Sequence, residues 1–89
     1  MAHWEYTLNL RDIWKEPGIP FDKMRDAVVQ RIVDSDFWKD TLEFDLEANY
    51  ELTSIIEDMS MSRNMREFNL AWSDFYDFAD EYRIWVVTA

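Results

Sequence analysis

The chain has 89 residues, of which 48% are hydrophobic and 17% aromatic, and its formal net charge is −10 at pH 7. This length fits a single domain over residues 1–89, and the apolar content excludes a disordered acidic tail. Cysteine is absent, which excludes a disulfide framework, a thiolate zinc site and a thiol nucleophile.

The charge is concentrated after the first third of the chain. Residues 1–33 carry five acids and five bases, whereas residues 34–89 carry fourteen acids and four bases and so hold the whole net charge. Such an asymmetry places a negative field on one side of the molecule. Because contacts to phosphates require cationic side chains, we expect no direct binding to nucleic acid.

The first predicted element is a strand over residues 3–10, "HWEYTLNL", in which polar and apolar residues alternate strictly. The side chains expected to face the core are Trp4, Tyr6, Leu8 and Leu10. A single helical turn is expected next, followed by a loop, because the only glycine and both prolines fall within residues 17–20.

Apolar residues at helical spacing then predict a helix over residues 21–34 and a second over about 42–59. Between them, "SDFWKD" favours a turn or short helix with Ser35 as its cap. The second helix is expected to bury one apolar stripe, formed by Phe44, Ala48, Leu52, Ile55, Ile56 and Met59.

The strongest periodic signal predicts a helix from Arg63 to Tyr82, with Ser62 as its N-cap. Its expected core face consists of Met65, Phe68, Trp72, Phe75, Tyr76, Ala79 and Tyr82. The β-branched and aromatic segment "RIWVVT" then predicts a closing strand.

These elements predict a small α+β domain of order β-α-α-α-β, with three helices packed on a two-stranded sheet of the terminal strands. The order of the elements does not determine whether the strands are parallel. An isolated two-stranded sheet is marginal in water. Either the helices support the sheet, or its open edges pair with a second copy to form a homodimer.

Carboxylates recur at helical spacing on the two longest predicted helices. They are Glu43, Glu47, Glu51 and Asp58 on the earlier helix and Asp74, Asp77 and Glu81 on the later one. No basic residue lies between Asp40 and Arg63. Because like charges at i, i+4 cost roughly 0.2–0.5 kcal/mol per pair, both faces together retain about 1–2 kcal/mol of avoidable repulsion.

Three segments of the chain resemble short, acidic, uncharacterised proteins encoded by bacteriophages of actinobacteria. They are "MAHWEYTLNLRDIW", "KMRDAVVQRI" and "AWSDFYDFADEYRIWV". The resemblance covers most of the chain and implies an accessory phage protein that acts in the host cytoplasm. It includes no catalytic signature, so it assigns no functional residues.

The residues favour no enzyme. The sole histidine, His3, is not accompanied by a G-x-S-x-G motif that would supply a nucleophilic serine. A single glycine cannot form a glycine-rich phosphate-binding loop. Asp74, Asp77 and Glu81 share a helix face, but regularly spaced helix carboxylates rarely converge on one ion. We therefore expect no catalytic residues, no metal and no cofactor. The start of the chain is unlike a signal peptide, and the longest apolar run is "IWVV", so a soluble intracellular protein without a membrane partner is expected.

Two interpretations of the carboxylates remain open. A high net charge keeps an aromatic-rich protein soluble, whereas a negative face also selects a partner with a basic surface. In the second case Leu70, amid the acids, and Phe78, at their margin, would anchor the partner, together with Trp38. Met59, Met61 and Met65 would add either an adaptable patch or ordinary core packing.

The favoured function is therefore a non-enzymatic protein-binding module that perturbs a host protein. A DNA mimic that inhibits a DNA-binding host enzyme is the first alternative, because carboxylates on successive helical turns lie about 6 Å apart. A self-assembling structural accessory protein is the second. The expected partner-binding residues are Glu43, Glu47, Glu51, Asp58, Leu70, Asp74, Asp77, Phe78 and Glu81.

Overall fold

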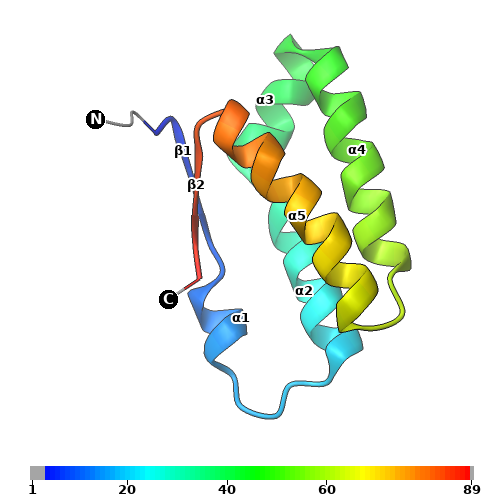
Figure 1. The fold of residues 1–89 in the computed structure, drawn as a ribbon. Coiled ribbons are helices and arrows are strands. Elements are labelled where there is room, and N and C mark those ends of the chain that lie inside the picture. The colour runs from blue at the N-terminus through cyan, green and yellow to red at the C-terminus, as the bar shows by residue number, and fades with distance from the viewer. Residues whose placement is uncertain (1–3, 89) are drawn as a thin grey trace.

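The computed structural model describes residues 4–88, which form five helices and two strands (Figure 1). His3 lies outside the described residues. The elements are β1 Tyr6–Asn9, α1 Arg11–Lys15, α2 Phe21–Val33, α3 Asp36–Phe44, α4 Leu46–Met61, α5 Met65–Glu81 and β2 Ile84–Val87. The α+β class and the pairing of the terminal strands are confirmed, whereas the expected number of three helices is wrong.

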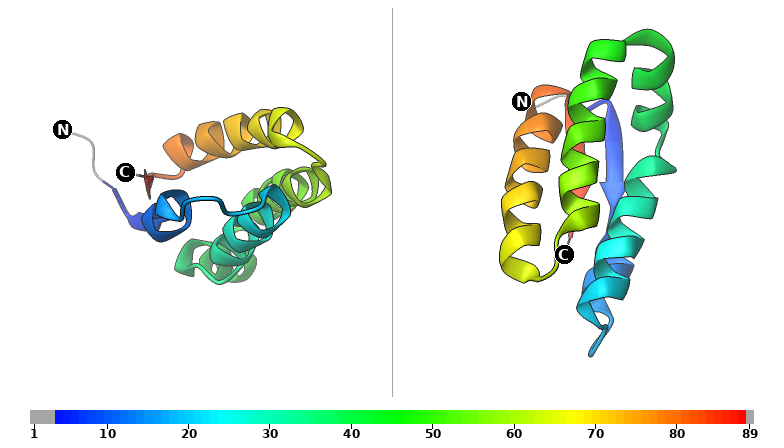
Figure 2. Two further views of the ribbon diagram at one scale, coloured as in Figure 1. Left: turned by 90° about the horizontal axis from the view of Figure 1, so that it is seen from below. Right: turned by 90° about the vertical axis from the view of Figure 1, so that its right-hand side faces the viewer.

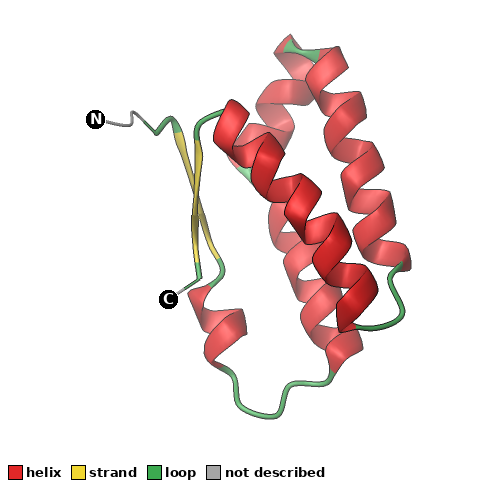
Figure 3. Cartoon of the chain, viewed as in Figure 1, coloured by secondary structure: helices red, strands yellow, loops and turns green. Residues whose placement is uncertain are grey.

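The molecule has two layers, with the long helices on one side of the sheet (Figure 3). The strands pair in parallel, with Tyr6 opposite Ile84 and Asn9 opposite Val87. Leu8 and Ile84 face the helices and are each 2% exposed. Trp4, expected to point inward, precedes β1 and is 41% exposed.

The parallel orientation follows from the path of the helices between the strands. Figures 1 and 2 show α3 continuing in the direction of α2, α4 returning alongside them, and α5 reversing again before the chain enters β2. The helices therefore form three alternating arms, and β2 begins at the same end of the molecule as β1. Crossover helices are the usual connection between parallel strands.

The helix predicted over residues 42–59 is interrupted at Asp45. This residue has φ −148°, outside the helical region, and its carboxylate accepts a hydrogen bond from the Ala48 N–H at 3.1 Å. Asp45 thus ends α3 and caps α4, which is a favoured role for aspartate. Phe44, expected in the core stripe, lies in α3 and is 77% exposed.

Buried polar side chains join α3 to α4 across this interruption. Asn49 Nδ2 donates to Thr41 Oγ1 at 3.2 Å, and the Thr41 hydroxyl donates to the Trp38 carbonyl at 2.9 Å. Both Asn49 and Thr41 are buried. Since buried polar groups are costly without partners, this pairing favours the observed packing of α3 on α4 over alternative registers.

Of the two predicted helix caps, Ser35 is confirmed and Ser62 is wrong. Ser35 caps α3, because its hydroxyl accepts from the Trp38 N–H. Ser62 was expected to cap the last helix, but Asn64 does so by accepting from the Glu67 N–H at 3.0 Å. Ser62 instead ends α4, where its hydroxyl donates to the Met59 carbonyl. The last helix therefore begins at Met65.

The core is rich in aromatic rings from α5. Trp72 lies 5.9 Å from Phe68, 5.3 Å from Phe75 and 5.5 Å from Trp14, measured between ring centroids. The expected burial of Trp72 and Phe75 is confirmed at 9% and 0% exposure. Such ring pairs add about 0.5–1.5 kcal/mol beyond their buried area. This packing fixes which side of α5 is left for solvent.

Candidate protein-binding surface

An open groove of about 400 Å³ runs between α4 and α5 on the solvent side of their contact. It is lined by Glu51, Ser54, Ile55, Asp58, Asp74 and Asp77. The two helices run in opposite directions side by side (Figures 1 and 2). The apolar side of each helix faces the core. The carboxylates on the other side of each helix are therefore exposed along the two rims of the groove.

The negative charge extends beyond the groove to Tyr82, at the end of α5. Burial raises the pKa of the Tyr82 hydroxyl above its ordinary value, and the charges of Asp45, Glu81, Glu51 and Glu47 raise it further. The Tyr82 hydroxyl is thus influenced by carboxylates of α4, of α5 and of the junction between α3 and α4. We use the name acidic groove for the combined surface, formed by Glu47, Glu51, Asp58, Asp74, Asp77 and Glu81.

Within residues 4–88, arginine side chains form ion pairs with carboxylates elsewhere in the fold. Arg25 pairs with Asp26 at 2.9 Å, Arg31 with Asp12 at 2.8 Å and Arg63 with Glu67 at 3.6 Å. None of these carboxylates belongs to the acidic groove. The last turns of α4 and α5 also contain no basic residue, although cations there would stabilise the helix ends. The repulsion expected from the sequence is thus retained within α4 and α5, whereas the break at Asp45 separates Glu43 from Glu47.

Two of the predicted partner-binding residues are placed differently. Glu43 belongs to α3, before the break at Asp45, so it does not continue the line of carboxylates on α4. Phe78 was expected at the margin of the acidic face, but it is 1% exposed and stacks on Tyr82 with ring centroids 4.4 Å apart. Phe78 is a core residue and not a surface anchor.

Leu70 remains a candidate anchor. It is 69% exposed and lies one helical turn before Asp74, on the same side of α5. Trp38 is half-buried against the core. Of the three methionines, Met59 is buried, whereas Met61 and Met65 are exposed near the turn between α4 and α5.

The chemistry of the acidic groove suits cationic side chains. Carboxylates accept charge-assisted hydrogen bonds from arginine and lysine, and these are stronger than bonds between neutral groups. Within residues 4–88, no cluster of three or more acids or histidines is arranged to hold a metal ion. Ile55 on the floor of the groove adds a small apolar contact.

A second groove, between β1 and the junction of α2 with α3, was not predicted from the sequence. Arg31 crosses one end of it to bond the Asn9 carbonyl, and near its other end the Tyr6 hydroxyl donates to the Asp40 carboxylate at 2.6 Å. These contacts join residues at least 22 positions apart in the chain. No local sequence pattern indicates such pairings.

Comparisons of this chain with protein-family models, with curated proteins and with solved structures found no match. Within the part of the chain that the structure describes, every helix is too short or too polar to cross a membrane.

Proposed function

We propose that this protein is a non-enzymatic binding module that attaches to a basic surface of another protein through its acidic groove. The supporting observation is that the groove carboxylates from α4 and α5 are gathered without an ion pair to any arginine or lysine within residues 4–88. Complementary charge on a partner would relieve this repulsion and accelerate association. Leu70, exposed beside the acids, would supply an apolar contact.

The resemblance of the sequence to actinobacterial phage proteins motivates the proposal of a partner in an infected host. We propose an accessory phage protein that acts in the host cytoplasm and perturbs a host protein. Exposed charge is also compatible with solubility alone. The two explanations differ in whether the position of the charges matters or only their number.

A capture experiment separates position from number. The protein, immobilised on resin, is exposed to an extract of an actinobacterial host, beside a variant with Asp74→Lys and Asp77→Lys. The matched control carries Glu16→Lys and Asp22→Lys, which change the net charge equally at exposed positions outside the acidic groove. We expect the groove variant to lose the partner and the control to retain it. Equal capture by all three would show that the groove is not the binding surface.

A DNA mimic is the second candidate. The observation that favours it is that the carboxylates follow two adjacent helices for several turns, with about 6 Å between successive turns, comparable to the spacing of neighbouring phosphates. In that case duplex DNA would displace the captured partner, and rising salt would weaken the complex. A partner that stays bound in excess duplex DNA would exclude this candidate.

A self-assembling accessory protein, joined through the sheet edges, is the third candidate. A two-stranded sheet has one open edge on each strand. Mass measurement by light scattering after size exclusion tests it directly, since a monomer at high protein concentration would exclude assembly of this kind.

A further inference from the structure

The backbone of β1 has an edge that is not used by β2. Leu10 donates its N–H to the Val87 carbonyl at 2.8 Å, and Tyr6 donates to the Arg83 carbonyl at 3.3 Å. In a parallel ladder, alternate residues direct both backbone groups to the same neighbouring strand. The even-numbered residues of β1 therefore face β2, and Thr7 and Asn9 direct their N–H and C=O groups to the opposite side.

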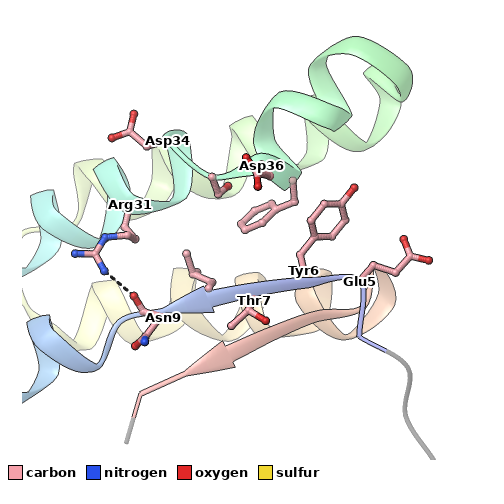
Figure 4. Close-up of a pocket in the computed structure, with 10 residues that line it drawn as sticks. Glu5, Tyr6, Thr7, Asn9, Arg31, Asp34 and Asp36 are labelled. Carbon is pink, nitrogen blue, oxygen red and sulfur yellow. Dashed lines mark hydrogen bonds between the residues drawn. The ribbon is translucent and has the colours of Figure 1, made fainter.

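A hydrogen bond from Arg31 shows that this edge of β1 faces α2. Arg31 of α2 donates from Nη1 to the Asn9 carbonyl at 2.6 Å (Figure 4). Its guanidinium is held in place by two bonds to the Asp12 carboxylate, at 3.0 and 2.8 Å. Thus Arg31 satisfies the outward carbonyl at one end of the edge. Within residues 4–88, no side chain bonds the outward groups of Thr7.

A groove of about 530 Å³ lies along this edge, between β1 and the junction of α2 with α3. Its lining includes Leu8 and Phe37, both 2% exposed, together with Thr7, Asn9, Arg31 and Asp36. Figure 4 shows these side chains on both sides of the space. The groove thus offers an apolar base beside a row of backbone donors and acceptors.

The charge of the groove restricts what fits in it. Three carboxylates, from Glu5, Asp34 and Asp36, line it, and the single cation of its lining, Arg31, is already paired with Asp12. An entering strand with basic side chains would complement this lining. A second copy of this chain would bring the same three carboxylates and a net charge of −10 to the contact, so self-pairing is opposed.

We propose that the free edge of β1 binds an extended segment of another protein that carries lysine or arginine side chains, as a third strand of the sheet. Backbone hydrogen bonds would supply affinity, and side-chain contacts on alternate residues would supply selectivity. Since β1 spans four residues, the site would take a segment of similar length, about 13 Å. This site is separate from the acidic groove and does not depend on it.

The test uses a fluorescent synthetic peptide of alternating lysine and valine, six residues long. Two further peptides of the same charge are N-methylated on either the odd or the even residues, which removes backbone donors on one edge at a time. We expect one methylated peptide to bind at least about tenfold more weakly than the other by fluorescence anisotropy, because only one edge faces β1. Equal binding by both methylated peptides would overturn the proposal.

Variants of the protein locate the site. Thr7→Pro removes an outward N–H while leaving the ladder to β2 intact, and proline is tolerated at such edge positions. Asp34→Lys with Asp36→Lys reverses the charge of the groove. We expect each to weaken peptide binding at least about tenfold, and Glu16→Lys with Asp22→Lys, at exposed positions outside both grooves, to leave it within about twofold. The thermal transition of each variant reports whether it is folded.

Amide chemical shifts of the wild-type protein provide a result that does not depend on any variant folding. Titration of the unmodified peptide is expected to shift the amides of Thr7 and Asn9 most. Shifts confined to α4 and α5 would overturn the proposal. It would also be overturned if the free protein formed a dimer that Thr7→Pro dissociates, because the occupant of the edge would then be a second copy of the chain.

Discussion

Replacing Asp77 by lysine should stabilise the free protein. Asp77 is exposed and lies three or four residues from Asp74, Asp80 and Glu81 on α5. Each such pair of like charges costs roughly 0.2–0.5 kcal/mol, so removing the three repulsions contributes about 1 kcal/mol to the free energy of unfolding. For a domain of this size, that raises the melting temperature by about 4–8 °C.

Glu67→Lys makes the same change of charge at the other end of α5 and should have the opposite effect. Glu67 Oε1 accepts from the Arg63 N–H at 2.8 Å and pairs with the Arg63 guanidinium. Its loss removes a capping interaction and an anion that the positive end of the helix dipole favours, a cost of about 1 kcal/mol.

Thermal and urea unfolding of the two variants and the wild type at low and high salt would measure both effects. The stabilisation by Asp77→Lys should shrink at high salt, because exposed charges are screened. If both substitutions raised stability equally, relief of the overall net charge would explain the result, and the local arrangement of charges on α5 would not determine stability.

Three further substitutions test the fold and its surface. Phe78→Ala should lower the free energy of unfolding by about 3–5 kcal/mol, whereas Leu70→Ala should change it by less than about 0.5 kcal/mol; similar losses would contradict the assigned burial. Asp45→Ala should cost about 1 kcal/mol through loss of the α4 cap, measured by urea unfolding, and an unchanged midpoint would count against that cap. The hydrogen bond to Asp40 raises the pKa of Tyr6 from its ordinary value to about 12. The stability that this hydrogen bond contributes is fully present below pH ~10 and is lost as the pH rises through about 12. Phenolate absorbance should show a tyrosine that titrates near pH 12 and that Tyr6→Phe removes, and an identical titration in that variant would refute the assignment.

The sequence predicted the types of most elements because their periodic patterns are long. The break at Asp45 was missed because the apolar stripe continues through it, from Phe44 to Ala48 and Leu52, at unbroken helical spacing. The signals for the break are a cap and a buried pair between Thr41 and Asn49, and the pair forms only once α3 packs on α4. Tertiary contacts decided this boundary.

The misplacement of Phe78 has a related cause. A single apolar stripe assumes one packing partner for a helix, but α5 packs against α4 on one side and against β2 on another. The buried arc is therefore wider and turned toward the sheet, so that Phe78 is buried while Met65 and Tyr76, expected in the core, are 47% and 43% exposed. The sequence contains no indication of where the sheet would lie.

For the candidate site, the sequence indicated the carboxylates of each helix face but not how the two helices are placed against each other. Regular spacing on one helix indicates which carboxylates share a face, as it did for Asp74 and Asp77. It does not indicate which face of another helix lies opposite, or that Glu51 and Asp58 form the other rim. The groove along β1 depends on strand direction and on Arg31, and neither can be read from a local pattern.

Binding through the acidic groove is tested by the affinity of the captured host protein, once purified, for three forms of this chain. These are the wild type, the variant with Asp74→Lys and Asp77→Lys, and the equally charged variant with Glu16→Lys and Asp22→Lys. We expect the groove variant to bind at least about tenfold more weakly and the control to stay within about twofold of the wild type. Equal weakening of both variants would show that the net charge matters and the acidic groove does not.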